Sequence, residues 1–339
     1  MNKLRYLLAP LWVLQLATGA KAFSDNPLIG SRRLNRLGLH IARARLAHAM
    51  ADWRRRRLRR FVSAADAAAF ARDGFVCLPD FLPAERFAAL RDETLGYAGA
   101  AREHRQGDTI TRRIALDPEA LGALPAARSL LQDRRWRGLI RYVWSYDAEP
   151  LLYIQTILAQ RFDSYPDPQT ALHADTFHPT VKAWLFLTDV DDADGPLTYV
   201  AGSHRLTRAR LAWERDRSVR ARDELDRLSS RGSFRIGEDE LATLGLPLPT
   251  RFAVPANTLV VADTSGFHAR GFAAHPSVRV EIWADGRRNP FLPWVGFDLA
   301  GLPGLAERRV RLWWRLGDRL AHWTVQHWVD VGRKRPADE

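Results

Sequence analysis

Three residues with metal-binding side chains suggest chemistry at one place in the fold. His173 and Asp175 are two residues apart, so on a β-strand their side chains point to the same face. His268, far along the chain, supplies a second imidazole. Two histidines and one carboxylate can hold a divalent metal on one side and leave its other positions open, as in non-heme Fe(II) oxygenases. We therefore expect these three residues to converge on one metal.

An arginine follows the second histidine at a distance that suggests a role beside the metal. Arg279 lies eleven residues after His268, on an apolar stretch that alternates with polar residues. A guanidinium presents a fixed fork of donors that binds a carboxylate better than a lysine does. We expect Arg279 to bind a carboxylate co-substrate; the alternative is a salt bridge with Glu281 on the same strand face.

Short strands must position these residues. Apolar or alternating runs separated by turn residues predict a strand series, which favours an antiparallel sandwich or barrel. The predicted strands are Leu151–Leu158, Lys182–Thr188, Leu197–Val200, Phe252–Pro255, Thr258–Val261 and Arg279–Ala284. Upstream, we expect a helix through Ala65–Arg72 with Ser63 as its N-cap, a strand at Phe75–Leu78 and a helix opening at Pro83. The segment 110–150 is mixed, with helices expected around Asp117–Leu131 and Trp136–Trp144.

The net charge of +12 is concentrated at one end of the chain. Residues 1–60 hold 14 of the 51 Lys and Arg residues and only two of the 39 acidic residues, so their excess of positive charge equals that of the whole chain. The remaining residues are neutral overall. A general argument from basic charge to nucleic-acid binding therefore fails, and the single cysteine, Cys77, excludes an internal disulfide framework.

The basic N-terminal arm has three interpretations. Residues 1–22 have the outline of a signal peptide, with Ala20-Lys21-Ala22 as an A-x-A-like site. Leu34, Leu37, Ile41 and Ala44 recur at helical spacing among arginines, before the run from Trp53 to Arg60, which favours a helix lying on an anionic membrane surface. A solvated charged helix is the plain alternative, and nucleic acid is an unlikely partner.

The C-terminal end repeats this pattern. Val310, Trp313, Leu316, Leu320, Trp323 and His327 follow a helical period with arginines between them, which predicts a basic, Trp-rich helix within residues 301–339. It either packs on the body or, with residues 1–60, faces a membrane through 305–335. We expect an oxygenase-like domain over 61–300, with a strand core at 151–290 and a charged insertion at about 208–243.

The chain resembles the phytanoyl-CoA dioxygenase family of Fe(II)/2-oxoglutarate-dependent oxygenases. The resemblance covers roughly residues 64–290. It rests on the segment Ala71–Leu82, on His173-Ala174-Asp175, on the strand from Val181 to Val190, on Asp194-Gly195-Pro196-Leu197 with Gly202-Ser203-His204, and on Phe267-His268 with Arg279.

This resemblance implies a fold, a cofactor set and residue roles. The fold would be α+β with a mainly β core, a cupin-like double-stranded β-helix (jelly roll) with flanking helices. His173, Asp175 and His268 would hold Fe(II), with 2-oxoglutarate and O2 as co-substrates and ascorbate in support. Trp184 would line the pocket, although core packing is an equal alternative, and Gln155 would hydrogen-bond the co-substrate. Asp175 marks a hydroxylase rather than a halogenase type, because halogenases carry a small residue there.

Two positions depart from the family pattern, and three further histidines lie near the motif. Leu172 replaces an aromatic residue that is common in relatives, and Arg270 replaces a small hydroxyl residue, which leaves open whether Arg270 contacts the co-substrate. We expect structural roles for His178, His204 and His275, and Cys77 to act as a small apolar side chain.

The prediction from the sequence is an oxygenase that hydroxylates an aliphatic C–H bond of a lipid-like or membrane-presented small molecule. Because 2-oxoglutarate is an intracellular metabolite, we expect a cytoplasmic protein, peripheral on the inner membrane face. The alternatives are a non-catalytic cupin-like metal-binding or sensing protein, and a basic protein associated with membranes or nucleic acid.

Overall fold

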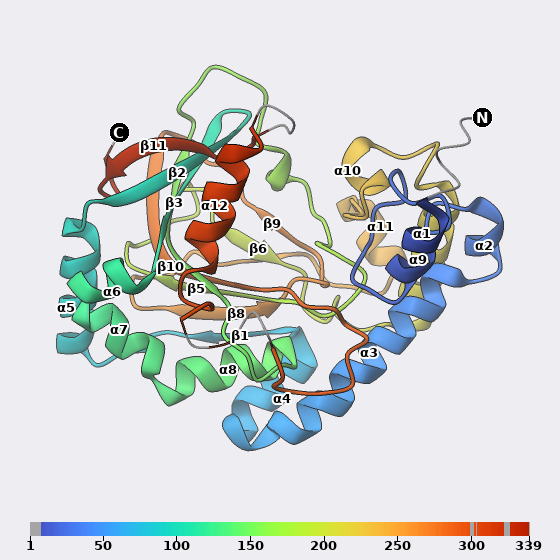
Figure 1. Cartoon of the computed structure of the whole chain (residues 1–339), viewed down its shortest axis with the longest axis horizontal. Helices are drawn as coiled ribbons and strands as arrows, with labels where there is room; N and C mark the ends of the chain where they lie inside the picture. The colour runs from blue at the N-terminus through green and yellow to red at the C-terminus, as the bar shows by residue number, and fades with distance from the viewer. Residues whose placement is uncertain (1–7, 299–301, 303, 322–325, 339) are drawn as a thin grey trace.

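A computed structural model describes residues 8–298, 302, 304–321 and 326–338. Its centre is an eight-stranded antiparallel sheet (Figure 1) with the strand order β1-β8-β5-β10-β4-β3-β2-β11. The strands are β1 (Phe75–Leu78), β2 (Gly99–Gln106), β3 (Thr109–Ala115), β4 (Leu151–Ala159), β5 (Val181–Phe186), β8 (Leu259–Asp263), β10 (Ser277–Gly286) and β11 (Val329–Lys334). A smaller sheet, ordered β7-β6-β9, contains β6 (Leu197–Tyr199), β7 (Thr250–Arg251) and β9 (His268–Arg270).

The two sheets form the predicted double-stranded β-helix, so the expected fold class is confirmed. Alternate residues of strand β10 pack on opposite faces of the large sheet. Val280, Ile282 and Ala284 belong to the main hydrophobic core, whereas Trp283 belongs to a second core cluster on the other face. Successive side chains of a strand point to opposite faces, so the residues that alternate with the core residues line the inside of the barrel.

Helices cover the outer face of the large sheet. Residues of α5 (Ala84–Gly96), α7 (Pro125–Gln132) and α8 (Arg134–Trp144) share the main core with outward-facing strand residues such as Ile114, Ile154 and Leu185. Helices α4 (Ala64–Asp73) and α6 (Pro118–Ala123) lie beside them (Figure 1). Ser63 caps α4 as predicted, since its side chain accepts a hydrogen bond from the Asp66 N–H.

The N-terminal arm packs against the body. It contains α1 (Ala9–Leu16), α2 (Arg32–Arg36), α3 (Leu39–Leu58) and the 3₁₀ turn Arg59–Phe61. It lies beside the insertion helices α9 (Arg208–Arg220), α10 (Arg227–Ser230) and α11 (Glu238–Thr243), on the right in Figure 1. A second 3₁₀ turn spans Pro168–Thr170. No helix in the described ranges combines the length and the hydropathy that a bilayer crossing requires.

Several residues of the arm that we expected at a membrane surface are buried. Ile41 and Ala44 pack inside the protein. Within the arginine run, Arg54 is 1% exposed and donates to the backbone carbonyls of Ser145, Pro290 and Leu292. A buried guanidinium has to satisfy its five donors within the protein. The amphipathic pattern around Ile41 therefore reflects packing on the body at these positions.

The prediction of one C-terminal helix was wrong. Helix α12 spans only Arg309–Arg319, and Val329–Lys334 forms the edge strand β11, which pairs with β2. Trp323 lies outside the described residues. The helical period ends because Val329, Val331 and Arg333 alternate like a strand, and the open edge of β2 offers unpaired backbone groups.

Other strand predictions need smaller corrections. The segment Phe252–Pro255 is not a strand, since only an isolated bridge joins Val254 to Val190, and β7 precedes it. Strands β2 and β3 form a hairpin that we did not predict, although its turn contains Gly107 with a φ of +60°. Glycine followed by Asp108 is a common hairpin signal, but the many charged residues hid the alternation around it.

Candidate metal and co-substrate site

The structure brings together the three predicted metal ligands, which lie far apart in the sequence. His173 and His268 pair across an antiparallel bridge, and each backbone N–H donates to the other residue's carbonyl at 2.9 Å. Residues that are paired in this way project their side chains to the same face. The Nε2 atoms of both histidines lie 3.8 Å from Oδ1 of Asp175, so the three groups can converge on one ion.

Hydrogen bonds orient both imidazoles toward a common point. Nδ1 of His173 lies 2.8 Å from the Ala171 carbonyl, and Nδ1 of His268 lies 3.0 Å from the Gly266 carbonyl. A carbonyl only accepts, so each Nδ1 carries the proton and each Nε2 keeps its lone pair. Nε2 of His268 is buried and has no hydrogen-bond partner among the described residues. An orphaned acceptor beside a carboxylate is what a metal site requires.

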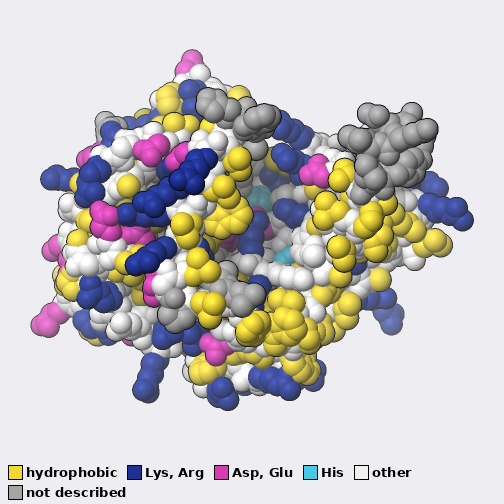
Figure 2. Space-filling view, in the orientation of Figure 1, with side chains coloured by type: hydrophobic (Ala, Val, Ile, Leu, Met, Phe, Trp, Pro, Cys, Tyr) yellow, Lys and Arg dark blue, Asp and Glu magenta, His cyan; other side chains and the backbone are white. Residues whose placement is uncertain are grey.

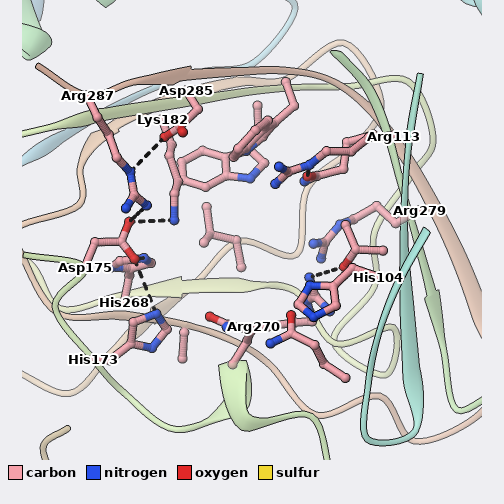
Figure 3. A pocket seen from close by; sticks show the side chains of 18 of the residues that line it. His104, Arg113, His173, Asp175, Lys182, His268, Arg270, Arg279, Asp285 and Arg287 are labelled. Atoms are coloured by element: carbon pink, nitrogen blue, oxygen red, sulfur yellow. Dashed lines mark hydrogen bonds and ion pairs between the residues drawn. The ribbon is translucent and has the colours of Figure 1, made fainter. Parts of the chain in front are cut away.

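Asp175 presents one oxygen to the histidines and the other to two cations. Its Oδ2 lies 2.7 Å from Nζ of Lys182 and 3.3 Å from a terminal nitrogen of Arg287. Figure 3 marks these contacts with dashed lines. Burial alone would raise the pKa of Asp175, but Lys182 and Arg287 outweigh burial and hold this pKa well below its ordinary value. The carboxylate is therefore ionised, with Oδ1 left for a metal.

The two histidines remain neutral in this environment. Burial, reinforced by the neighbouring His268 and Arg235, holds the pKa of His173 well below its ordinary value. Burial also lowers the pKa of His268 to about 4, although Asp175 opposes this shift. Only neutral imidazole binds a metal, so the ligand set is prepared for an ion at neutral pH.

A cavity of about 280 Å³ opens beside these ligands. Figure 2 shows it as a hollow in the surface with histidine side chains visible inside. Its walls come from the inner faces of β2, β3, β4, β5 and β10 and from the small sheet. Besides the metal ligands, its lining includes His104, Thr111, Arg113, Gln155, Lys182, Trp184, Arg270, Arg279, Trp283, Asp285, Arg287 and Trp328.

Arg279 lines this cavity and also forms the salt bridge with Glu281 that was the alternative expectation. Its Nε donates to Glu281 at 3.0 Å, and one terminal nitrogen donates to the Gly195 carbonyl at 2.9 Å. Its other terminal nitrogen has no hydrogen-bond partner among the described residues. The guanidinium is thus fixed in orientation while one donor nitrogen stays available.

Gln155 lies between two arginines of the cavity. Its amide nitrogen donates to the fully buried Glu281 at 2.7 Å, and its amide oxygen accepts from Nε of Arg113 at 2.9 Å. Arg113, Gln155 and Glu281 are register partners on the neighbouring strands β3, β4 and β10. Both ends of the Gln155 amide are therefore occupied, and it holds Arg113 and Glu281 in place.

Arg270, the departure from the family pattern, is held by its neighbours. One terminal nitrogen forms an ion pair with the buried Asp167, and the other donates to the Thr111 hydroxyl at 3.2 Å. Trp184 lies in the second core cluster and also lines the cavity, so the pocket and core interpretations both describe it. Leu172 is buried in a small apolar cluster behind the site.

The turns that resemble family motifs support the ligands. Gly195 has a φ of +71°, and a Cβ there would lie 2.6 Å from the Gly271 carbonyl oxygen, so glycine is required where this loop meets Arg279. The Ser203 hydroxyl accepts from the Phe267 N–H at 2.8 Å, next to the ligand His268. His204 is buried in the same turn.

Sequence reasoning missed the cations that surround the ligands. Lys182 alternates with Trp184 on β5, which places both on the inner face and was a usable signal. Arg113 belongs to the unpredicted hairpin, and Arg287 follows the end of β10. Lys21, from the N-terminal arm, donates to the backbone carbonyl of Asp175. No local pattern links Lys21 to a residue more than 150 positions away.

Residues 70–232 match the family model described as phytanoyl-CoA dioxygenase (PhyH). The match includes His173 and Asp175 but ends before His268 and Arg279, whose place in the site comes from the structure. Comparison with curated protein sequences gives no match.

Comparison with solved structures gives matches to several proteins that were crystallised with a metal, some of them also with 2-oxoglutarate. The epimerase SnoN, crystallised with Fe³⁺, alpha ketoglutarate and nogalamycin RO, has 20% identity and a TM-score of 0.44, and the match covers 65% of this chain and 81% of that one. HygX from Streptomyces hygroscopicus, crystallised with nickel and 2-oxoglutarate, has 18% identity and a TM-score of 0.43 over 66% and 85% of the two chains. EctD from S. alaskensis with bound Fe has 18% identity and a TM-score of 0.38 over 73% and 85%.

Proposed function

We propose that this chain, which matches the phytanoyl-CoA dioxygenase family model over residues 70–232, is an Fe(II)/2-oxoglutarate-dependent enzyme that hydroxylates an aliphatic C–H bond of a small molecule bound in the cavity beside His173, Asp175 and His268. The observation that carries this proposal is the convergence of two neutral imidazole nitrogens and one ionised carboxylate oxygen on a single point at the cavity wall.

Different residues would bind the metal and the co-substrate. His173, Asp175 and His268 would hold Fe(II) on one side and leave its remaining positions directed to the cavity. Arg279 would bind the distal carboxylate of 2-oxoglutarate through its available terminal nitrogen. Together with O2, these bound groups supply the oxidising power that hydroxylates a C–H bond and converts 2-oxoglutarate to succinate and CO2.

Lys182 and Arg287 assist by fixing the Asp175 carboxylate. Because they occupy Oδ2, the carboxylate can donate only Oδ1 to the ion, which favours one-oxygen binding. Aromatic side chains complete the walls, since Trp184 and Trp283 are register partners on the neighbouring strands β5 and β10 and both line the cavity. Their rings limit the water that can reach the substrate side.

The test is turnover of labelled 2-oxoglutarate by the purified chain with Fe(II) and ascorbate. We expect CO2 release that is lost in His268→Ala and kept in His275→Ala, because His275 is exposed and lies outside the triad. For Arg279→Gln, we expect a rise in the KM for 2-oxoglutarate of about tenfold or more. Release that does not exceed the background of His268→Ala would contradict the proposal.

We also propose that the apolar residues at the rim of the cavity contact an anionic membrane surface on the cytoplasmic side. Leu11, Val13 and Leu14 of α1 are between 49% and 66% exposed, and Trp313 of α12 is 69% exposed. Figure 2 shows apolar patches on both sides of the hollow. Exposed arginines of α2 and α12, such as Arg32, Arg33, Arg315 and Arg319, would add attraction of about 1 kcal/mol each. This arrangement would suit a lipid-like substrate.

Vesicle sedimentation tests this association. We expect binding to vesicles that contain phosphatidylserine, weaker binding to phosphatidylcholine vesicles, and loss of binding in Leu14→Asp combined with Trp313→Asp. Leu248→Asp, at another exposed leucine, is the matched control. Equal partitioning of the double variant and the control would reject the membrane contact.

A further inference from the structure

Arg113 occupies an unusual place in the cavity wall. Its guanidinium lies 4.0 Å from the ring centre of Trp283, 4.5 Å from that of Trp328 and 5.2 Å from that of Tyr153. All three distances are within the range of a cation–π interaction. The rings replace water around the cation, and this burial lowers the pKa of Arg113 to about 10, so the side chain stays charged at neutral pH.

The Nε end of the Arg113 guanidinium is held by a hydrogen bond, whereas its terminal nitrogens are available to a ligand. Nε donates to Gln155, whose amide is held in turn by the buried Glu281. Neither terminal nitrogen of Arg113 has a hydrogen-bond partner among the described residues. Figure 3 shows the guanidinium directed into the cavity, near Arg279. Arg113 thus presents two pre-oriented donor nitrogens to any molecule that enters.

The charges of the side chains that line the cavity also set Arg113 apart. Five Lys and Arg side chains line the cavity, and four of them have an acidic partner: Lys182 with Asp175, Arg287 with Asp285, Arg270 with Asp167, and Arg279 with Glu281. Arg113 has no ion-pair partner in the described part of the chain. The two positive charges of Fe(II) and the two negative charges of 2-oxoglutarate cancel, so loading the site leaves the charge of Arg113 uncompensated.

We infer that Arg113 binds an anionic oxygen group of the substrate, a carboxylate or a phosphate, while Arg279 serves the co-substrate. This inference rests on the proposed function, because an enzyme of that kind would hold two anions, the substrate and 2-oxoglutarate. Arg113 would bind the first and Arg279 the second. Trp283 and Trp328 would pack beside the anionic group and exclude water, which strengthens the charged hydrogen bonds. The substrate is therefore an anion that places its C–H bond toward the metal ligands.

Binding of simple anions tests this assignment without knowledge of the substrate. The probes are benzoate for a carboxylate, inorganic phosphate for a phosphate, and benzamide as a neutral control. Calorimetry is done on the full chain with Fe(II) and saturating 2-oxoglutarate without O2, and repeated on the metal-free chain. We expect benzoate or phosphate to bind at least about tenfold more tightly than benzamide, and Arg113→Gln to remove this preference. The anion that binds more tightly identifies the class.

Binding of 2-oxoglutarate, followed by the absorbance of its Fe(II) complex, separates the two arginines. We expect Arg113→Gln to leave this affinity within about twofold, and Arg279→Gln to weaken it about tenfold or more. Arg113→Lys keeps the charge and guards against a folding defect in Arg113→Gln; it should retain part of the anion preference.

Two results would overturn the inference. One is an equal loss of 2-oxoglutarate affinity in both glutamine variants, which would make Arg113 part of the co-substrate site. The other is binding of both anions by the wild type no more tightly than benzamide. Failure of the proposed function has a different signature, because Fe(II) and 2-oxoglutarate would then not bind the wild type, whereas the anion preference would still be measurable on the metal-free chain.

Discussion

His173 and His268 are direct partners across an antiparallel bridge, with their ring centres 4.6 Å apart. The backbone hydrogen bonds of this pair set the separation of the two imidazoles before any ion is present. The site is therefore preorganised by the backbone bridge between His173 and strand β9 rather than by the metal.

Preorganisation leads to a prediction for His268→Ala. We expect this variant to lose binding of Co(II), used as an air-stable probe, by about 100-fold or more, because one of three protein ligands is missing. Its fold should persist, since the backbone bridge to His173 does not use the side chain. Titration calorimetry together with far-UV circular dichroism checks both parts. His275→Ala, an exposed histidine, should bind Co(II) like the wild type.

Lys182 provides a second test, of the carboxylate rather than the imidazoles. Lys182→Met keeps most of the side-chain volume but removes the cation 2.7 Å from Oδ2 of Asp175. We expect metal affinity to fall by about 10- to 100-fold, as is typical when a group that orients a ligand is lost. Lys334→Met, on the edge strand β11, is the matched control. Unchanged affinity for Co(II) in Lys182→Met would mean that Arg287 alone fixes Asp175.

Gly195 and Gly38 form a matched pair for testing the loop next to Arg279. Both have positive φ, but a Cβ at Gly38 would meet nothing within 4 Å, whereas a Cβ at Gly195 would clash with the Gly271 backbone. We expect Gly38→Ala to lower the free energy of unfolding by about 1–2 kcal/mol. Gly195→Ala should cost more and should also raise the KM for 2-oxoglutarate, since the Gly195 carbonyl holds Arg279. Urea denaturation and steady-state kinetics measure the two effects.

Two buried histidines outside the metal site predict how stability depends on pH. Burial lowers the pKa of His178 to about 3 and that of His204 to about 4, whereas the unfolded chain protonates both near 6.5. The contribution of the two neutral histidines to the free energy of unfolding is present above pH 6.5. It is lost as the pH falls toward 4, because the unfolded state then binds more protons than the folded state. Between pH 7 and pH 5 we expect a loss of about 2 kcal/mol for each histidine.

Urea denaturation of the metal-free chain at the two pH values measures this loss. His204→Asn should show a smaller difference between pH 7 and pH 5, while His275→Asn should not change it. If the wild type were equally stable at both pH values, the buried histidines would have to be charged in the folded state.

The sequence predicted the parts of the site whose signals are local. His173 and Asp175 share a strand-like spacing, and the alternation around Arg279 indicated its strand. The fold class followed from the short strands between residues 151 and 284. These features are encoded by neighbouring residues, so periodicity and motif spacing were sufficient to find them.

The remaining parts depend on contacts between distant segments. Arg113 pairs with Gln155 across two strands, and the hairpin that carries Arg113 is rich in charge, which masked its alternation. Trp328 reaches the cavity only because β11 pairs with β2. Likewise, Arg54 and Arg55 resemble a surface run in sequence, yet buried carbonyl and carboxylate groups accept their hydrogen bonds.

The pairing of β11 with β2 also bears on how a substrate would enter. Strand β11 is one of the two edge strands of the large sheet, most of its residues are exposed, and its register is interrupted between Asp330 and Arg333. Such an edge frays at lower free energy than the core strands. We expect its amides to exchange hydrogen earliest in the sheet. Fraying would swing the Trp328 side of the wall outward while the iron ligands stay in place.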